Sequence, residues 1–256
     1  MKNYYITFCL VIILLFNTLA KAQNTQFSTT SLQLNYGTGF TDNMYGYNTQ
    51  NKGMSTVVFE NFLTWKYGTN FFMVAYLNGK FLSFDDSLTN ERSRIYTECA
   101  PNLSLCKILN IRELKLPIIR DVYLGAQLSM SSYSSFFGQF IGGGVSFRVP
   151  KGALADLFLY YRHDNFNNKT IHSAFVYTFP FRLGRTHWSI EGVADASQLK
   201  YWGTDALAQP RLFWVPFYNR TNLRQKNWCK VGIEYYVHYN NRLNIHAPQL
   251  ALRMTW

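Results

Sequence analysis

The final stretch of the chain is Gln249-Leu250-Ala251-Leu252-Arg253-Met254-Thr255-Trp256, in which a large apolar residue occupies every second position. Side chains of a β-strand point alternately to its two faces, so this stretch predicts a strand with one apolar and one mostly polar face. The same alternation occurs over residues 121–130 and 230–238, and polar side chains share one face over residues 94–105. A period of two therefore dominates the chain.

The composition excludes a bundle of membrane helices. Among 256 residues, the 21 Phe, 18 Tyr and 6 Trp outnumber the 25 Lys and Arg taken together with the 14 Asp and Glu. The longest apolar run, over residues 4–16, is too short for an ordinary spanning helix. Alternation without such runs is typical of a transmembrane β-barrel, with lipid outside and a polar, partly aromatic lumen. A soluble β-sandwich also alternates, but its polar face is typically Lys, Thr, Ser and Glu rather than aromatic residues mixed with Arg and carboxylates.

The N-terminus contains the three regions of a secretory signal peptide. Lys2 supplies the positive region, residues 4–16 the apolar region, and Ala20-Lys21-Ala22 a small-x-small cleavage site. We therefore predict a signal peptide over residues 1–22 and one barrel domain over residues 23–256. Cleavage lowers the formal net charge of +11 by two, because Lys2 and Lys21 are removed. Export, together with the lack of dense Lys/Arg runs, argues against nucleic acid as a partner.

The number of strand candidates agrees with a closed barrel. About 10 residues per strand cross a bilayer, and bacterial single-chain barrels have an even number of strands. Twelve candidates begin near Ser31, Ser55, Thr69, Arg94, Ile119, Phe136, Ala153, Thr170, Thr186, Pro210, Asn227 and Ala247. We predict an all-β, antiparallel transmembrane barrel of about twelve strands in a Gram-negative outer membrane, with ten or fourteen strands as alternatives. The aromatic end of the chain, Trp256, is typical of the last strand of such barrels and predicts recognition by barrel assembly machinery.

Cysteine and histidine spacing predicts no disulfide framework, metal site or cofactor. Cys99, Cys106 and Cys229 remain after cleavage, an odd number for an exported protein. On one continuous strand Cys99 and Cys106 lie about 23 Å apart, so they can pair only if a turn intervenes. No His residue has the spacing of a zinc site. The run 142–144 of three glycines lacks the Lys-Ser/Thr of a phosphate loop and indicates close strand packing or a bend.

Six stretches, at residues 55–60, 65–72, 96–98, 160–162, 191–195 and 209–214, carry a family resemblance. The first two resemble an acidic strand followed by Trp-x-x-Gly and a Phe-Phe strand. In this order the six stretches resemble the Tsx-like family of nucleoside-specific outer-membrane channels, in particular its divergent branch of small exported proteins. The resemblance spans nearly all of the mature chain. It implies a twelve-stranded barrel that passes nucleosides through a narrow channel lined by aromatic and ionisable side chains.

The lumen candidates are the large polar and aromatic residues that share faces along the predicted strands. Nucleobases stack on aromatic rings with about 1–3 kcal/mol per base, and carboxylates and Arg bond sugar hydroxyls and base edges. The candidates are Glu60, Phe62, Lys66, Phe72, Tyr76, Arg94, Tyr96, Glu98, Asp121, Tyr123, Tyr160, Arg162, Glu191, Asp195, Lys230, Glu234, Tyr236 and Arg253. For each charge the alternative is a structural ion network that fills the barrel. Glu60 and Glu98 are the preferred functional candidates, since both lie mid-strand beside aromatic residues.

The leading hypothesis is a passive channel for nucleosides or similarly small polar aromatic solutes. The alternative is a plugged barrel that acts as a surface receptor or structural protein, which a lumen filled with aromatic side chains would favour. We predict no enzyme: His238 with Glu234, or His163 with Asp164, resembles part of an acid/base pair, but no Ser or Cys nucleophile accompanies either. The segment 235–239 is predicted to be an aromatic girdle at the end of a strand.

Overall fold

The computed structural model describes residues 25–42, 46–83, 85–111, 114–166, 169–200, 203–217 and 229–256. The predicted signal peptide, and the predicted strand start at Asn227, lie outside the described residues. Nearly all of the described chain is β-strand, and no described helix is both long and apolar enough to cross a bilayer.

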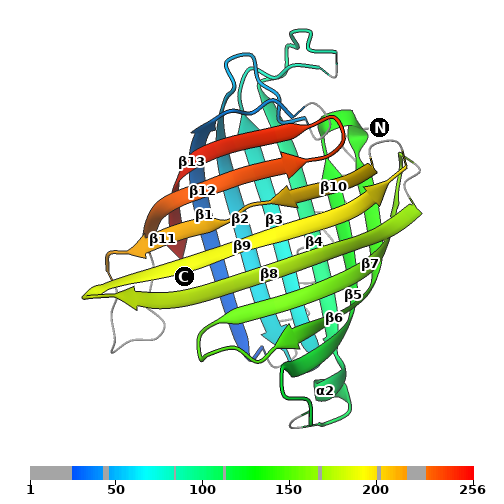
Figure 1. Ribbon diagram of the computed structural model, residues 1–256, viewed down its shortest axis with the longest axis vertical. Helices are drawn as coiled ribbons and strands as arrows, with labels where there is room; N and C mark the ends of the chain where they lie inside the picture. Colours follow the sequence, from blue (N-terminus) through cyan, green and yellow to red (C-terminus); the bar gives the residue numbers. More distant parts are fainter. Residues whose placement is uncertain are drawn as a thin grey trace.

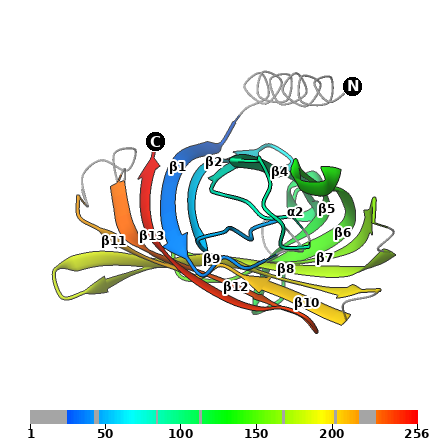
Figure 2. The same cartoon turned by 90° about the horizontal axis from the view of Figure 1, so that it is seen from above.

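The strands form one antiparallel sheet that closes on itself (Figures 1 and 2). They are β1 (Phe27–Thr38), β2 (Gly53–Trp65), β3 (Gly68–Asn78), β4 (Ser93–Ser104), β5 (Ile119–Ser131), β6 (Phe137–Phe147), β7 (Leu154–Asp164), β8 (Lys169–Leu183), β9 (Thr186–Leu199), β10 (Gly203–Ala208), β11 (Arg211–Val215), β12 (Cys229–Tyr239) and β13 (Asn244–Thr255). A short helix α2 (Leu105–Ile108) follows β4, and a 3₁₀ turn η1 (Tyr133–Ser135) follows β5. Pairing of β1 with β13 completes the barrel.

The thirteen described strands occupy twelve positions around the wall. Both β10 and β11 lie between β9 and β12, and they are separated by Gln209 and Pro210. Proline has no backbone N–H to give to a ladder, so it interrupts the strand at this point. Its carbonyl still accepts a hydrogen bond from Tyr235 N at 2.9 Å. The prediction of about twelve strands is confirmed, with one strand position broken in two.

The two ends of the barrel differ in their connections. The end at which β1 begins and β13 finishes, the terminal end, has two-residue turns at residues 66–67 and 184–185. It also has the longer connection that contains α2. The opposite end, the loop end, has the connections 39–52 and 79–92. An even number of strand positions places the start of β1 and the end of β13 at the same end of the barrel.

The wall has the two faces that the alternation predicts. Leu124, Leu128 and Leu250 point outward and are 56%, 43% and 69% exposed, while Gln127 and Gln249, between such residues, are buried inside. With lipid around the barrel these outward side chains are covered, and each strand position pairs with both of its neighbours. The apolar residues of the C-terminal stretch therefore face outward, as predicted.

Cys99, Cys106 and Cys229 are free thiols, so Cys99 and Cys106 do not form a disulfide. Cys99 lies on β4 and Cys106 on α2. The glycine run lies in the middle of β6, where strands approach closely as predicted. A Cβ at Gly142 would be 2.0 Å from the carbonyl oxygen of Leu159 on β7.

Gly142→Ala is therefore expected to destabilise the barrel by about 1–3 kcal/mol, since the backbone of β7 must shift to admit a methyl group. The measurement is the temperature at which the compact barrel unfolds in detergent, followed by its changed mobility on electrophoresis. Gly53→Ala is the matched control, because its Cβ would have no neighbour nearer than 3.8 Å. Equal unfolding temperatures for the two variants would contradict the close-packing explanation.

Candidate functional site

The lumen is lined by alternate residues of each strand, and all but three of the predicted lumen residues point into it. The inward residues are Glu60, Phe62, Arg94, Tyr96, Glu98, Asp121, Tyr123, Tyr160, Arg162, Glu191, Asp195, Lys230, Glu234, Tyr236 and Arg253. Their position in the lumen is a fact of the structure; their role in binding a solute stays a prediction.

The exceptions are Lys66, Phe72 and Tyr76, for which the lumen prediction is wrong. Lys66 lies exposed in the turn between β2 and β3, with its Nζ 4.9 Å from the centre of the Tyr67 ring. Phe72 is on the outer face of β3, where its ring packs 6.4 Å from that of the outward residue Phe59. Tyr76, on the same face, is 42% exposed.

The error on β3 has one physical cause. Trp65 pairs with Gly68 across the two-residue turn, so Glu60 pairs with Met73. Paired residues of antiparallel strands share a face, and even-numbered inward residues on β2 therefore require odd-numbered inward residues on β3. The inward residues of β3 are Phe71, Met73, Ala75 and Leu77.

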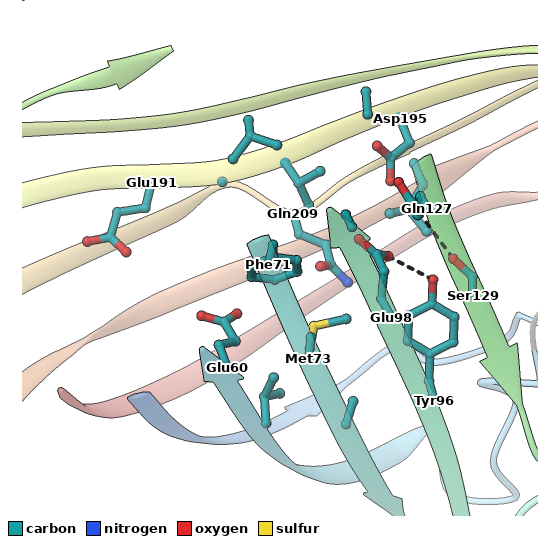
Figure 3. Close-up of a pocket in the computed structure, with 18 of the residues that line it drawn as sticks. Glu60, Phe71, Met73, Tyr96, Glu98, Gln127, Ser129, Glu191, Asp195 and Gln209 are labelled. Carbon is teal, nitrogen blue, oxygen red and sulfur yellow. Dashed lines mark hydrogen bonds between the residues drawn. The ribbon is translucent and has the colours of Figure 1, made fainter. Parts of the chain in front are cut away.

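A cavity of about 460 Å³ occupies the lumen. It reaches from Phe40 and Tyr47 near the loop end to Thr29 and Arg253 near the terminal end. Figure 3 shows side chains from β2, β3, β4, β5 and β9 converging on it, with Glu60 and Glu191 toward one side and Glu98 and Asp195 toward the other. Its volume falls within the range of small-molecule sites, about 300–1,000 Å³.

Aromatic rings form much of the cavity wall. Phe158 and Tyr160 stack with centroids 5.7 Å apart and planes 5° apart, and Tyr160 also stacks on His172. Phe140 meets the His172 ring edge to face at 4.9 Å. The other rings that line the cavity are Phe40, Tyr47, Phe62, Phe71, Tyr96, Phe136, Tyr177 and Tyr236. The stack next to β6 fits there because Gly144 has no side chain: a Cβ would lie 2.3 Å from the Phe158 ring.

An ion network on one side of the lumen joins charged residues of five strands, β2, β9, β11, β12 and β13. Glu60 pairs with Arg253 and, at 3.4 Å, with Arg211. Arg253 also binds Glu191 at 3.1 Å, and Glu191 pairs with Lys230 on β12. Removing one member of such a buried group leaves its partners uncompensated, which is strongly destabilising.

Glu234 lies at one end of this network and accepts hydrogen bonds from four side chains. Arg211 donates to its Oε2, as does Gln33 at 2.9 Å. Asn35 and Gln249 donate to Oε1 at 3.2 and 3.0 Å. Since every one of these donors comes from the wall, Glu234 and its neighbours brace β1, β11, β12 and β13 against one another.

The two preferred functional candidates have different environments. Glu60 belongs to the ion network, whereas Glu98 accepts a hydrogen bond from Tyr96 Oη at 3.1 Å and has no ion pair among the described residues (Figure 3). Asp195, toward the same side of the cavity, also lacks an ion pair within the described part of the chain. Glu98 and Asp195, together with Asp156 on β7, are therefore the cavity carboxylates that no ion pair among the described residues engages.

The loop end of the lumen is filled by the connections 39–52 and 79–92. Phe40 and Phe81 are 1% and 0% exposed and pack in one core cluster with Tyr236. Arg94, another predicted lumen residue, donates to backbone carbonyls of both connections, at Gly46 and, at 3.0 Å, at Leu82. These two loops form the loop plug.

A buried polar group fastens the loop plug to the wall. Asp42, in the 39–52 connection, accepts from Tyr236 Oη at 2.5 Å and contacts His238 Nδ1. The other ring nitrogen of His238 lies 2.6 Å from Asp205 on β10. Both contacts are hydrogen bonds when both ring nitrogens carry protons, so this arrangement suits an imidazolium between two carboxylates. Burial and the Asp42 carboxylate also raise the pKa of the Tyr47 phenol, which stays neutral in the plug.

Some of these residues were missed from the sequence. Alternation over residues 235–239 could have placed His238 inside: Tyr235 and Tyr239 are outward and exposed, as a girdle requires, but Tyr236 and His238 are buried inward. His238 partners Asp42 and Asp205 rather than Glu234. Asp42 carries no comparable signal, because a long connection has no period.

The closed antiparallel wall, apolar outside and polar inside, defines a transmembrane β-barrel of the outer-membrane type. No protein-family profile and no curated protein matches the chain. Among solved structures, a KdgM porin in complex with disordered oligogalacturonate is similar, at 8% identity over 88% of this chain and 99% of that one, with a TM-score of 0.49. OprB of Pseudomonas putida at low pH is 9% identical over 93% and 95% of the two chains, with a TM-score of 0.37. OpdH of Pseudomonas aeruginosa is 12% identical over 91% and 99%, with a TM-score of 0.31.

Similarity at this level is confined to the barrel architecture. The comparisons return no match specific to the Tsx-like family, so that resemblance stays a prediction.

Arg253→Leu is expected to lower the stability of the folded barrel by about 3–5 kcal/mol, because Glu60 and Glu191 each lose a buried partner. Unfolding in urea from lipid vesicles, followed by tryptophan fluorescence, measures the change. Arg182→Leu, at an exposed position near the 184–185 turn, is the control. A loss no larger than that of the control would show that the network contributes little.

Asp42→Ala is expected to loosen the loop plug, since Tyr236 and His238 lose a shared acceptor on the 39–52 connection. The predicted result is a higher single-channel conductance in planar bilayers. Asp85→Asn, in the exposed part of the 79–92 connection, should leave conductance unchanged. Identical conductance in wild type and Asp42→Ala would mean that this contact does not control passage.

Proposed function

We propose that the chain is a passive outer-membrane channel for nucleosides or similarly small polar aromatic solutes, exported through the signal peptide 1–22. The observation that carries this proposal is the cavity wall around Tyr96 and Glu98, where aromatic faces and an unpaired carboxylate line the same space. An aromatic solute can stack there while its polar groups bond the carboxylate. Weak binding suits a channel, because a solute must leave as readily as it enters.

The proposal includes the surroundings of the barrel. The outward leucines and aromatic residues provide an apolar surface for outer-membrane lipid. Trp256 exchanges backbone hydrogen bonds with Thr30 at 2.9 Å in each direction, so the residue proposed for recognition by the assembly machinery lies at the seam that closes the wall. No catalytic step is part of the proposed function.

A second candidate function is favoured by the loop plug. Phe40 and Phe81 are buried in a continuous apolar cluster at the loop end, as expected of a barrel that acts through its surface loops rather than by transport. The cavity below the plug favours the channel, since a purely structural interior would be packed throughout. Conductance across a bilayer separates the two functions.

Tyr96→Leu is expected to reduce the preference for nucleosides over a sugar of similar size about tenfold, because a stacking face and a hydrogen-bond donor to Glu98 are lost. Uptake of adenosine, uridine and the sugar into proteoliposomes measures the ratio. Tyr76→Leu is the matched control, since Tyr76 lies on the neighbouring strand but points outward. Equal uptake of all three solutes by the wild-type protein would overturn the selectivity claim.

A further inference from the structure

The charge of the cavity is opposite in sign to that of the chain. The whole chain has 25 Lys and Arg against 14 Asp and Glu. The cavity is lined by seven carboxylates, those of Glu60, Glu98, Asp156, Glu191, Asp195, Asp205 and Glu234, and by three guanidinium groups, those of Arg162, Arg211 and Arg253. The lumen is therefore acidic in a basic protein.

The cations of the lumen are already engaged. Arg211, Arg253 and Lys230 are bound to Glu60, Glu191 and Glu234 in the ion network. Arg162 pairs with Asp164 at 2.7 Å. None of these ion pairs includes Glu98 or Asp195, and Arg162, which lines the same cavity, is the one of these cations whose charge acts on Asp195.

Glu98 on β4 and Asp195 on β9 lie toward the same side of the cavity (Figure 3). Two carboxylates without a cation between them repel each other, and a positive charge placed between them removes that repulsion. The pair thus has the charge distribution of a cation site, but an acidic pair alone does not establish a ligand.

The unpartnered buried atoms of the cavity point to the same kind of ligand. Asn102, Asp156 and Gln249 are 6%, 8% and 5% exposed and line the cavity. Each has a buried side-chain oxygen without a hydrogen-bond partner: Asn102 Oδ1, Asp156 Oδ1 and Gln249 Oε1. All three atoms are acceptors, so what the cavity lacks is donors.

The amide orientations explain how two of these oxygens are left over. Gln249 donates its Nε2 to Glu234, and Asn102 donates its Nδ2 to the carbonyl of Ala100 at 3.3 Å. In each case the amide nitrogen donates to a group of the wall, while the amide oxygen has no hydrogen-bond partner. Asn102 is on the same face of β4 as Glu98, four residues further along.

We propose that the cavity is a binding site for a small aromatic organic cation, an ammonium or amidinium, held between Glu98 and Asp195 with its ring against Tyr96 and the neighbouring aromatic residues. This rests on the proposed function, in that the same lumen admits small aromatic solutes. The cation supplies both quantities missing from the cavity, positive charge and N–H donors. The described residues include no cluster of three His, Cys, Asp or Glu side chains that could hold a metal ion.

The test uses three planar aromatic compounds of nearly equal shape: benzamidine, which is a cation, benzamide, which is neutral, and benzoate, which is an anion. Calorimetric binding to the full barrel in detergent requires no open pore. Benzamidine is expected to bind about tenfold more tightly than benzamide, because charge-assisted hydrogen bonds are about twice as strong as neutral ones. Benzoate is expected to bind most weakly.

Variants of Glu98 and Asp195 test whether the preference for benzamidine depends on these two carboxylates. Glu98→Gln with Asp195→Asn keeps the shapes and removes both charges, and the preference for benzamidine over benzamide is expected to fall about tenfold. Asp85→Asn removes a carboxylate outside the cavity and should leave the preference intact. Heat-dependent mobility on electrophoresis verifies that each barrel is folded, and the two single variants replace the double variant if it does not fold.

Equal binding of the three compounds, or a preference that survives loss of both carboxylates, would overturn the cation site. Uptake of uridine into proteoliposomes is measured on the same preparations. Uridine uptake without a preference for benzamidine would overturn the cation site and leave the channel standing. A benzamidine preference without any uptake would support the site while contradicting transport.

Discussion

Closure of the wall is the constraint on which the rest of this structure depends. Strands that cross a bilayer have no water to satisfy their backbone groups, so each must pair on both sides, and the pairing of β1 with β13 removes the last free edges. Closure also links the faces of all strands. Once the register of every pair is set, each residue around the barrel is assigned to lipid or to lumen, and a one-residue shift of a strand would exchange its two sets.

The lumen then has to satisfy the polar side chains that this assignment places inside it. On one side it does so internally: Arg211 and Arg253 bridge Glu60, Glu191 and Glu234 across strands that are distant in sequence. On the opposite side, around Glu98 and Asp195, the described residues form no such bridge. Carboxylates therefore have two roles in one lumen: some hold the wall together and others face a solute. Whether a carboxylate is ion-paired distinguishes the two roles, and its residue type does not.

The sequence was sufficient for the wall and for most of the lumen, because both follow from a period of two. It was insufficient on β3, although the information was present: a two-residue turn at 66–67 fixes which residues pair, and would have moved the prediction from Phe72 to Phe71. It could not supply the partners of Glu60, since Arg211 and Arg253 lie 151 and 193 residues away along the chain. Nor could it place Asp42 against His238, because long connections follow no period and their path depends on the finished barrel.

The separation of charge between the chain and its cavity bears on how selectivity can arise. If wall cations paired with every carboxylate of the lumen, the barrel would be stable, but no carboxylate would remain to bind a solute. Leaving acceptors unmatched costs stability, and a ligand that brings donors removes that cost. Glu98 and Asp195 have no ion pair among the described residues, whereas Glu60, Glu191 and Glu234 are ion-paired. The stabilising network and the solute-facing group thus occupy opposite sides of one cavity, so the barrel can hold its shape with one while the other remains free to bind and release.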